Sequence, residues 1–249
     1  MIFRILICSV YLLTAISGFT QVELSKETTK KEKQKKVTKS EKSEKELSST
    51  GAFVLSNWSF TNRKLIENEG LFGDSLGYRA NETGLNTWSF GIGLRSQFHS
   101  NFAWEGGISY MKNGEQYLYE EVDTMYSYRT KYTYFAMPIK LYFTYGEKLK
   151  FLAGVGVVPQ MFAGYQQEVT WRDSEGKEES SSSKLKIGYN SFVISTVFNI
   201  GLQYDFTRRI GVFLMPEYRI QLTSSYLKTS SYKHYGRSLG GNIGLIINL

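Results

Sequence analysis

Apolar and polar side chains alternate with a period of two along nearly the whole chain beyond residue 50. The clearest example is the stretch 134–159, where every second residue from Phe135 to Phe143, and again from Phe151 to Val157, is apolar. The positions between them hold Lys140, Tyr142 and glycines. Such alternation predicts strands with one apolar and one polar face, because successive side chains in a strand point to opposite sides.

The same pattern predicts eight strands, near residues 51–60, 87–98, 102–110, 134–145, 149–159, 192–205, 210–222 and 238–249. Short turns are expected at 99–101, 146–148 and 206–208, and long polar connections at 61–86, 112–130, 166–188 and 223–236. This regular exchange of short and long connections is typical of an up-and-down transmembrane β-barrel, with short periplasmic turns and longer external loops. We therefore predict an all-β, eight-stranded antiparallel barrel with both termini on the periplasmic side.

Charged residues indicate which face contacts lipid. Within predicted strands two to eight, the charges all fall on the glycine-rich face: Arg95, Glu105, Lys140, Lys150, Asp205, Glu217 and Arg219. A charge facing the middle of a bilayer would cost about 2–4 kcal/mol, so the apolar face is expected to be the lipid face. The alternative is a soluble secreted barrel with its apolar face inward, but an eight-stranded interior is too narrow for so many large side chains.

The first fifty residues predict export and a tether. Residues 1–20 begin with one early positive charge, Arg4, followed by an apolar run and small residues, and indicate a secretory signal peptide cleaved before Gln21. The alternative, a membrane anchor, is disfavoured because the apolar run 5–19 is shorter than the roughly 20 residues that a spanning helix needs. Residues 21–50, rich in Lys, Glu, Ser and Thr, predict a disordered periplasmic tether, and residues 51–249 the barrel domain.

Composition excludes several other classes of protein. The net charge is +7, but nine Lys and six Glu in residues 23–46 supply three of these charges, so no folded basic surface for nucleic acid is expected. The single cysteine, Cys8, lies in the predicted signal peptide. No cofactor or metal is expected either, because the Gly154-x-Gly156 glycines belong to a strand and not to a phosphate-binding loop.

Polar residues on the inner face predict a charged network. Arg95 and Glu105 are equally far from the turn at 99–101, so we expect them opposite each other inside the barrel. Further inward-facing candidates are Lys140, Tyr142, Glu217 and Arg219, together with Gln97, Asn199 and Gln203. The structural interpretation is a salt bridge that fills a narrow interior. The functional alternative is a gate or ion path, although eight strands leave no room for a wide pore.

Catalysis is not expected from the two histidines. His99 falls in a short turn and His234 in the last long loop, beside several serines, where a lone histidine is ordinarily solvated. A lipid-modifying barrel enzyme is therefore the third candidate, after an interaction module and a narrow channel. The long loops 61–86 and 112–130 mix aromatic with charged residues, as contact surfaces do, and are expected to be external.

Three segments resemble a known family. They are "YFAMPIKLYFTYGEKLKFLAGVGVVPQMFAGY", "FNIGLQYDFTRRIGVFLMPEYRIQLTSSY" and the closing "GGNIGLIINL", and they resemble the PorT-like outer-membrane β-barrel domain of Gram-negative bacteria over about residues 51–249. The resemblance implies an outer-membrane location and insertion by the barrel-assembly machinery, which reads the last strand. Here that strand ends in Leu249, where an aromatic residue is commoner. Some relatives take part in protein secretion or gliding motility, so a role of that kind is a further alternative.

Overall fold

A computed structural model describes residues 49–67, 81–121, 124–172, 175–185 and 188–249. The predicted signal peptide and nearly all of the predicted tether lie outside the described residues. No helix among the residues described is long and apolar enough to span a membrane. The strands are β1 (Thr50–Glu67), β2 (Glu82–His99), β3 (Phe102–Glu120), β4 (Met125–Ala136), β5 (Ile139–Tyr145), β6 (Leu149–Arg172), β7 (Glu178–Leu185), β8 (Phe192–Asp205), β9 (Ile210–Gln221) and β10 (Tyr232–Asn248).

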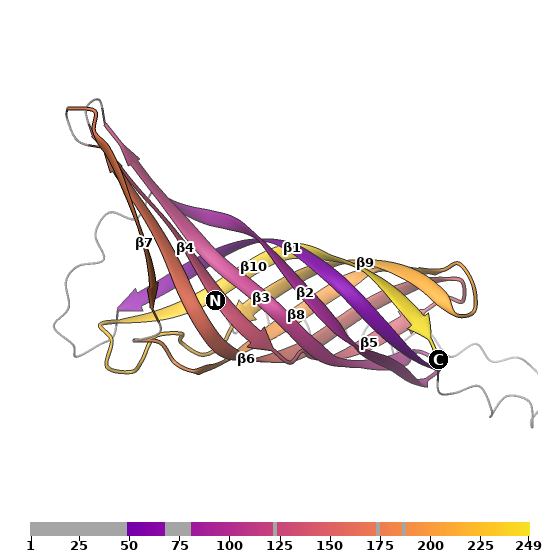
Figure 1. Ribbon diagram of the computed structural model, residues 1–249. Helices are drawn as coiled ribbons and strands as arrows, with labels where there is room; N and C mark the ends of the chain where they lie inside the picture. The colour runs from indigo at the N-terminus through magenta and orange to yellow at the C-terminus, as the bar shows by residue number, and fades with distance from the viewer. Residues whose placement is uncertain (1–48, 68–80, 122–123, 173–174, 186–187) are drawn as a thin grey trace, which may run out of the picture. The chain divides into compact units, whose positions relative to one another are not determined.

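The strands close into an antiparallel ring (Figure 1). Strand β1 pairs with both β2 and β10, and the order continues through β3, β4 and β5, β6, β8 and β9 back to β10. Strands β4 and β5 share one place in the ring, since both lie between β3 and β6, and β7 pairs with β6 alone. The predicted eight-stranded barrel is therefore confirmed.

A proline breaks the strand predicted over 134–145 into β4 and β5. Pro138 has no backbone N–H to donate to the ladder. Pairing continues around it, because the Met137 N–H donates to the Pro159 carbonyl (2.9 Å) and the Gly107 N–H to the Pro138 carbonyl (3.2 Å). The break thus interrupts one element without opening the ring.

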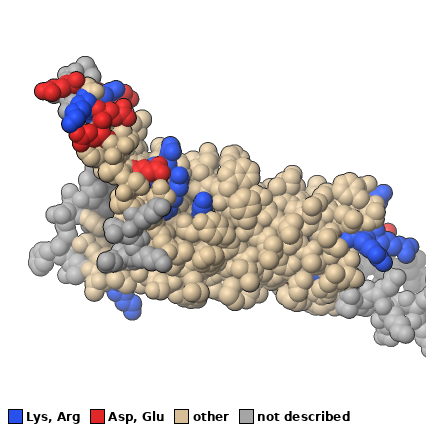
Figure 2. Space-filling model, viewed as in Figure 1, with Lys and Arg blue, Asp and Glu red and all other residues tan. Residues whose placement is uncertain are grey.

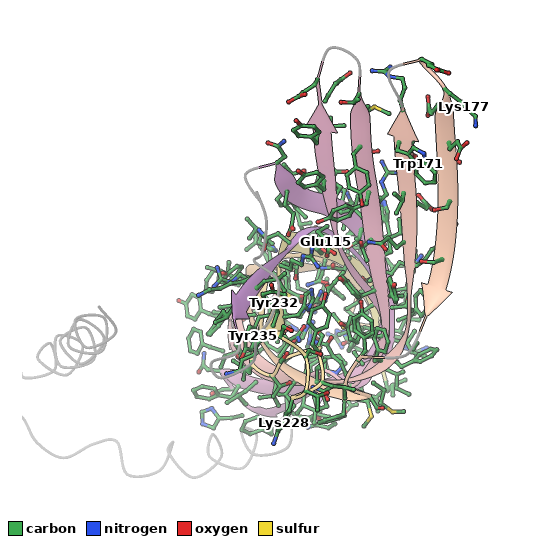
Figure 3. The ribbon with its side chains drawn as sticks, turned by 90° about the vertical axis from the view of Figure 1, so that its left-hand side faces the viewer. Glu115, Trp171, Lys177, Lys228, Tyr232 and Tyr235 are labelled. Carbon is green, nitrogen blue, oxygen red and sulfur yellow. The ribbon has the colours of Figure 1, made fainter. Side chains whose placement is uncertain are left out.

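The prediction of long loops is wrong for two of the four connections. Residues 112–130 and 166–188 are mostly strand, since β3 and β4 leave only residues 121–124 between them and β7 forms a hairpin with β6. The first strand is also longer than predicted and reaches Glu67. In these extensions both faces carry mainly polar side chains, so no apolar alternation marks them in the sequence. Strands β3, β4, β6 and β7 thereby form a sheet that projects from one end of the ring (Figures 1 and 3).

The apolar face of the barrel is outside, as predicted. Outward side chains such as Ile108 (61% exposed) and Phe135 are exposed, whereas Tyr134 and Tyr142 on the alternate positions are fully buried. Figure 2 shows a largely uncharged surface between charged groups at the two ends. We call this surface the apolar belt; its members include Val54, Trp58, Phe60, Trp88, Phe90, Ile92, Ile108, Tyr110, Phe135, Ile139, Val155, Phe198, Leu214, Ile243 and Leu245. A contiguous belt of this kind is typical of a surface that contacts lipid.

The two ends of the barrel differ. The turn end holds the short connections 100–101, 146–148 and 206–209, together with residues 50 and 249, whose backbones are hydrogen-bonded (2.8 Å). The sheet end holds the projecting strands. At the sheet end the belt stops at Tyr110 and Phe135. The next outward positions on these two strands are Lys112 and its partner Thr133, and Lys131 follows Thr133.

Candidate functional site: a charged network inside the barrel

Arg95 on β2 and Glu105 on β3 form the centre of the lumen. The register places them directly opposite each other. The Arg95 Nε and Nη2 atoms donate to Glu105 Oε2 at 3.0 and 2.6 Å. Glu105 is 0% exposed and Arg95 is also buried, because strand alternation turns both away from the belt. The two side chains therefore form an ion pair shielded from solvent.

Lys140 joins this pair to a second carboxylate. Its Nζ lies 3.2 Å from Glu105 Oε1 and 3.5 Å from Glu217 Oε2. The Tyr142 hydroxyl donates to Glu105 Oε1 at 3.5 Å. Each buried carboxylate is thus shared between several donors, as burial of a charge requires.

Glu217 on β9 extends the network toward the sheet end. The side-chain amides of Asn199 and Asn242 donate to its Oε2 at 3.0 and 2.9 Å. Arg219 Nη1 lies 3.7 Å from Glu217 Oε1, and its Nη2 donates to Asn113 Oδ1 at 2.8 Å. The six charged and tyrosine side chains singled out from the sequence therefore lie in one connected group.

The network also reaches the turn end, through Gln203 but not through Gln97, although both were predicted to belong to it. Arg95 Nη1 donates to Gln203 Oε1 (2.8 Å), and Gln203 Nε2 donates to Asp205 (2.8 Å), which pairs with Lys150 (2.9 Å). Gln97 lies apart, since its amide donates to the backbone carbonyl of Ser100 in the turn (2.7 Å).

Aromatic rings close the space around Arg95. Its guanidinium carbon lies 4.9 Å from the centre of the Phe213 ring and 5.0 Å from that of Tyr142. Figure 3 looks along the ring from the sheet end and shows side chains filling its interior. The cavity beside Lys140 and Glu217 measures about 30 Å³, as does the one beside Arg95 and Gln203. Each is large enough for about one water molecule, which is too small for a continuous passage.

A second buried cluster, which the sequence did not reveal, lies at the sheet end beyond the belt. Arg63 on β1 contacts Glu82 (3.0 Å) and Glu115 (3.3 Å), and the Tyr132 hydroxyl donates to Glu115 at 2.8 Å. Burial raises the pKa of Glu115 to about 7, and Arg63 opposes this shift. Apolar alternation stops at Phe60, but β1 continues to Glu67, and its period of two from Asn57 and Ser59 keeps Arg63 on the inner face.

His234 is placed differently from its predicted position. It lies within β10 and is 1% exposed, and its ring is tilted against those of Tyr132 and Tyr226, whose centres are each 5.0 Å away. The loop prediction was wrong because β10 starts earlier than the apolar pattern indicated. His99 ends β2 at the turn end and is exposed, with its Nδ1 3.2 Å from the Ser100 hydroxyl. In the described part of the chain, no group of three or more His, Cys, Asp or Glu side chains is arranged to hold a metal ion.

Comparison with known proteins finds likeness in structure alone. No family model and no curated protein matches the chain. Neisserial surface protein A matches with 11% identity over 80% of this chain and 97% of its own, at a TM-score of 0.39. The outer membrane protein OprG from Pseudomonas aeruginosa matches with 9% identity over 80% of this chain and 95% of its own, at a TM-score of 0.37. Ail, the attachment invasion locus protein of Yersinia pestis, matches with 16% identity over 78% of this chain and 98% of its own, at a TM-score of 0.32. At these values the fold rests on the strand pairings themselves, and the resemblance to the PorT-like family stays a prediction.

Proposed function

We propose that this chain is an integral outer-membrane β-barrel protein with a structural or interaction role, whose lumen is a sealed polar core and whose sheet end is a contact surface. In this proposal residues 1–20 direct export, residues 21–50 form a periplasmic tether, and the barrel-assembly machinery inserts residues 51–249. The turn end then faces the periplasm and the sheet end the exterior, in keeping with the short turns of such barrels.

The sealed lumen is the observation that carries this proposal. Arg95, Glu105, Lys140, Glu217 and Arg219 contact one another across the ring, and the cavities between them are about 30 Å³. An ion that crossed the barrel would have to displace several buried ion pairs at once. The group therefore serves to stabilise and fill the interior, which favours a structural core over a channel.

The inner face of the projecting sheet supplies a surface for contact. Tyr119, Tyr126 and Trp171 lie side by side across β3, β4 and β6, and Tyr117 stacks on Tyr128 at 5.3 Å. Tyr126 is 43% and Trp171 38% exposed, and Figure 3 places Trp171 well out along the projecting sheet. Aromatic side chains held on rigid strands are typical of protein contact sites.

Two measurements test the two halves of this proposal. In planar bilayers the purified protein is expected to show no conductance steps, and steady open conductance would contradict a sealed lumen. For the contact surface, a photoreactive phenylalanine analogue replaces Tyr126 on the inner face or Glu120 on the outer face of the same sheet. We expect discrete protein adducts from position 126 only. Equal adducts from both positions, or none from position 126, would contradict the contact surface. A heat-dependent shift in gel mobility of each protein controls for folding in the outer membrane.

A further inference from the structure

Three cationic side chains lie directly beyond the apolar belt at the sheet end. They are Lys112 on β3 and Arg129 and Lys131 on β4, and we call them the basic patch. The register pairs Lys112 with Thr133, Gly114 with Lys131, and Gln116 with Arg129, so the three cations occupy successive outward positions on two paired strands. Lys112 and Lys131 are diagonal neighbours in this pair, about 7–8 Å apart, and Arg129 follows Lys131 at the next outward position of β4. Such spacing is within reach of one anion for long side chains.

The patch begins where the belt ends. Lys112 Nζ lies 5.5 Å from the centre of the Tyr110 ring, and this ring packs edge-on against Phe135 at 5.8 Å. The cation therefore sits at the boundary between the apolar surface and water, the level at which lipid headgroups lie. Figure 2 shows charged atoms gathered where the projecting sheet leaves the uncharged surface.

A hollow in the barrel wall adjoins the patch. Its volume is about 820 Å³, and Tyr110, which touches Lys112, lines it together with Ile108 of the same strand. The rest of its lining comes from neighbouring strands and is almost entirely apolar. These residues are Val54, Leu55, Ser56, Phe90, Gly91, Ile92, Val212, Ile243, Gly244 and Leu245. The hollow opens on the belt, so it is suited to an acyl chain that runs down from the headgroup level.

We propose that the basic patch and this hollow together bind one lipid whose headgroup carries a phosphate monoester, with an acyl chain in the hollow. The patch holds three cations, and the register places one carboxylate, Glu168, opposite Arg129, which leaves a net charge of +2. The residue opposite Lys131 is the neutral Gln166. A phosphate monoester carries about −1.5 to −2 charges at pH 7, and a phosphodiester only one, so the monoester matches the patch better. This inference rests on the barrel spanning a lipid bilayer but not on the proposed contact surface.

The test uses the full chain refolded in phosphatidylcholine nanodiscs. Phosphatidic acid, a monoester, and phosphatidylglycerol, a diester, are added in turn, and bound lipid is counted by native mass spectrometry. We expect phosphatidic acid to bind more tightly, and the triple variant Lys112→Gln, Arg129→Gln and Lys131→Gln to lower its affinity by about tenfold or more. Equal affinity for the two lipids, or unchanged affinity in the triple variant, would overturn the proposal.

Two matched variants separate this site from general attraction to a cationic protein. Lys148→Gln, Arg208→Gln and Arg209→Gln remove as many charges from the turn end, and the affinity for phosphatidic acid is expected to stay within about twofold. Ile108→Trp fills the hollow and is expected to lower the affinity although the patch is intact. An equal loss in the turn-end variant, or no loss with Ile108→Trp, would count against the site.

The wild-type protein provides a test that needs no variant. A phosphate monoester loses its second charge near pH 6, so the affinity for phosphatidic acid is expected to fall between pH 8 and pH 5 while that for phosphatidylglycerol stays level. Millimolar inorganic phosphate is expected not to displace the lipid, because it lacks the chain that occupies the hollow. Displacement by inorganic phosphate, or a flat pH profile, would refute binding of a monoester lipid.

Discussion

Replacing Glu105 with glutamine removes one buried charge from the centre of the lumen with almost no change in volume. Glu105 is 0% exposed and accepts from Arg95 at 2.6 and 3.0 Å, with Lys140 Nζ 3.2 Å away. After Glu105→Gln, Arg95 has lost the carboxylate that it directly contacts, whereas Lys140 still lies 3.5 Å from Glu217. Leaving a buried charge without its partner costs about 3–5 kcal/mol, so we expect the free energy of unfolding to fall by about that amount.

The measurement is equilibrium unfolding of the refolded barrel in vesicles by urea, followed by tryptophan fluorescence and by gel mobility without heating. The matched control is Glu120→Gln. Glu120 pairs with Arg172 at 3.5 Å, but both side chains are well exposed, so the control is expected to lose no more than about 1 kcal/mol. If Glu105→Gln loses less than about 1 kcal/mol, the account of the lumen as a tightly paired charged core is wrong.

A double-mutant cycle identifies the cause of the loss. If an unpaired Arg95 is responsible, adding Arg95→Met to Glu105→Gln should recover part of the stability, since the buried cation is then gone too. Equal losses in the single and double variants would instead indicate that the lost stability comes from the other partners of Glu105, chiefly the ion pair with Lys140.

Two further predictions concern packing and pH. A Cβ on Gly154 would overlap the buried ring of Tyr142, so Gly154→Ala is expected to lower the free energy of unfolding by about 1–3 kcal/mol. A Cβ on Gly241 would have no atom within 4 Å, so Gly241→Ala should be nearly neutral. Equal effects of the two substitutions in urea unfolding would contradict this account. Glu115 has its pKa raised from 4.5 to about 7 in the folded state, so its contribution to stability is present below about pH 4.5 and is lost as the pH rises through 7. Glu115→Gln should therefore gain up to about 3 kcal/mol over wild type between pH 5 and pH 8, and equal pH profiles of the two proteins would refute the shift.

The alternation of side chains could be predicted without a structure. Successive side chains of a strand point to opposite faces, so a strand between apolar surroundings and a polar interior must alternate apolar with polar residues. Phe135 and Ile139 face outward and Lys140 inward for this reason. The pairing of Arg95 with Glu105 followed from their equal distance to a short turn, since a tight turn sets the register of the strands that it joins. The apolar outer surface, the ring and the central ion pair could thus be predicted from the sequence.

The strands and the buried cluster at the sheet end could be identified only from the tertiary structure. Beyond the belt both faces of a strand meet water or protein, so no alternation of apolar with polar residues marks the segments that hold Arg63, Glu115 and His234. The sequence therefore suggested loops there. Their strands persist because a neighbouring strand supplies the backbone hydrogen bonds. Residues from β1, β3, β4 and β10 meet there to form a buried cluster. Alternation depends on the solvent on each side of a single strand, whereas these contacts depend on which strands the closed ring brings together.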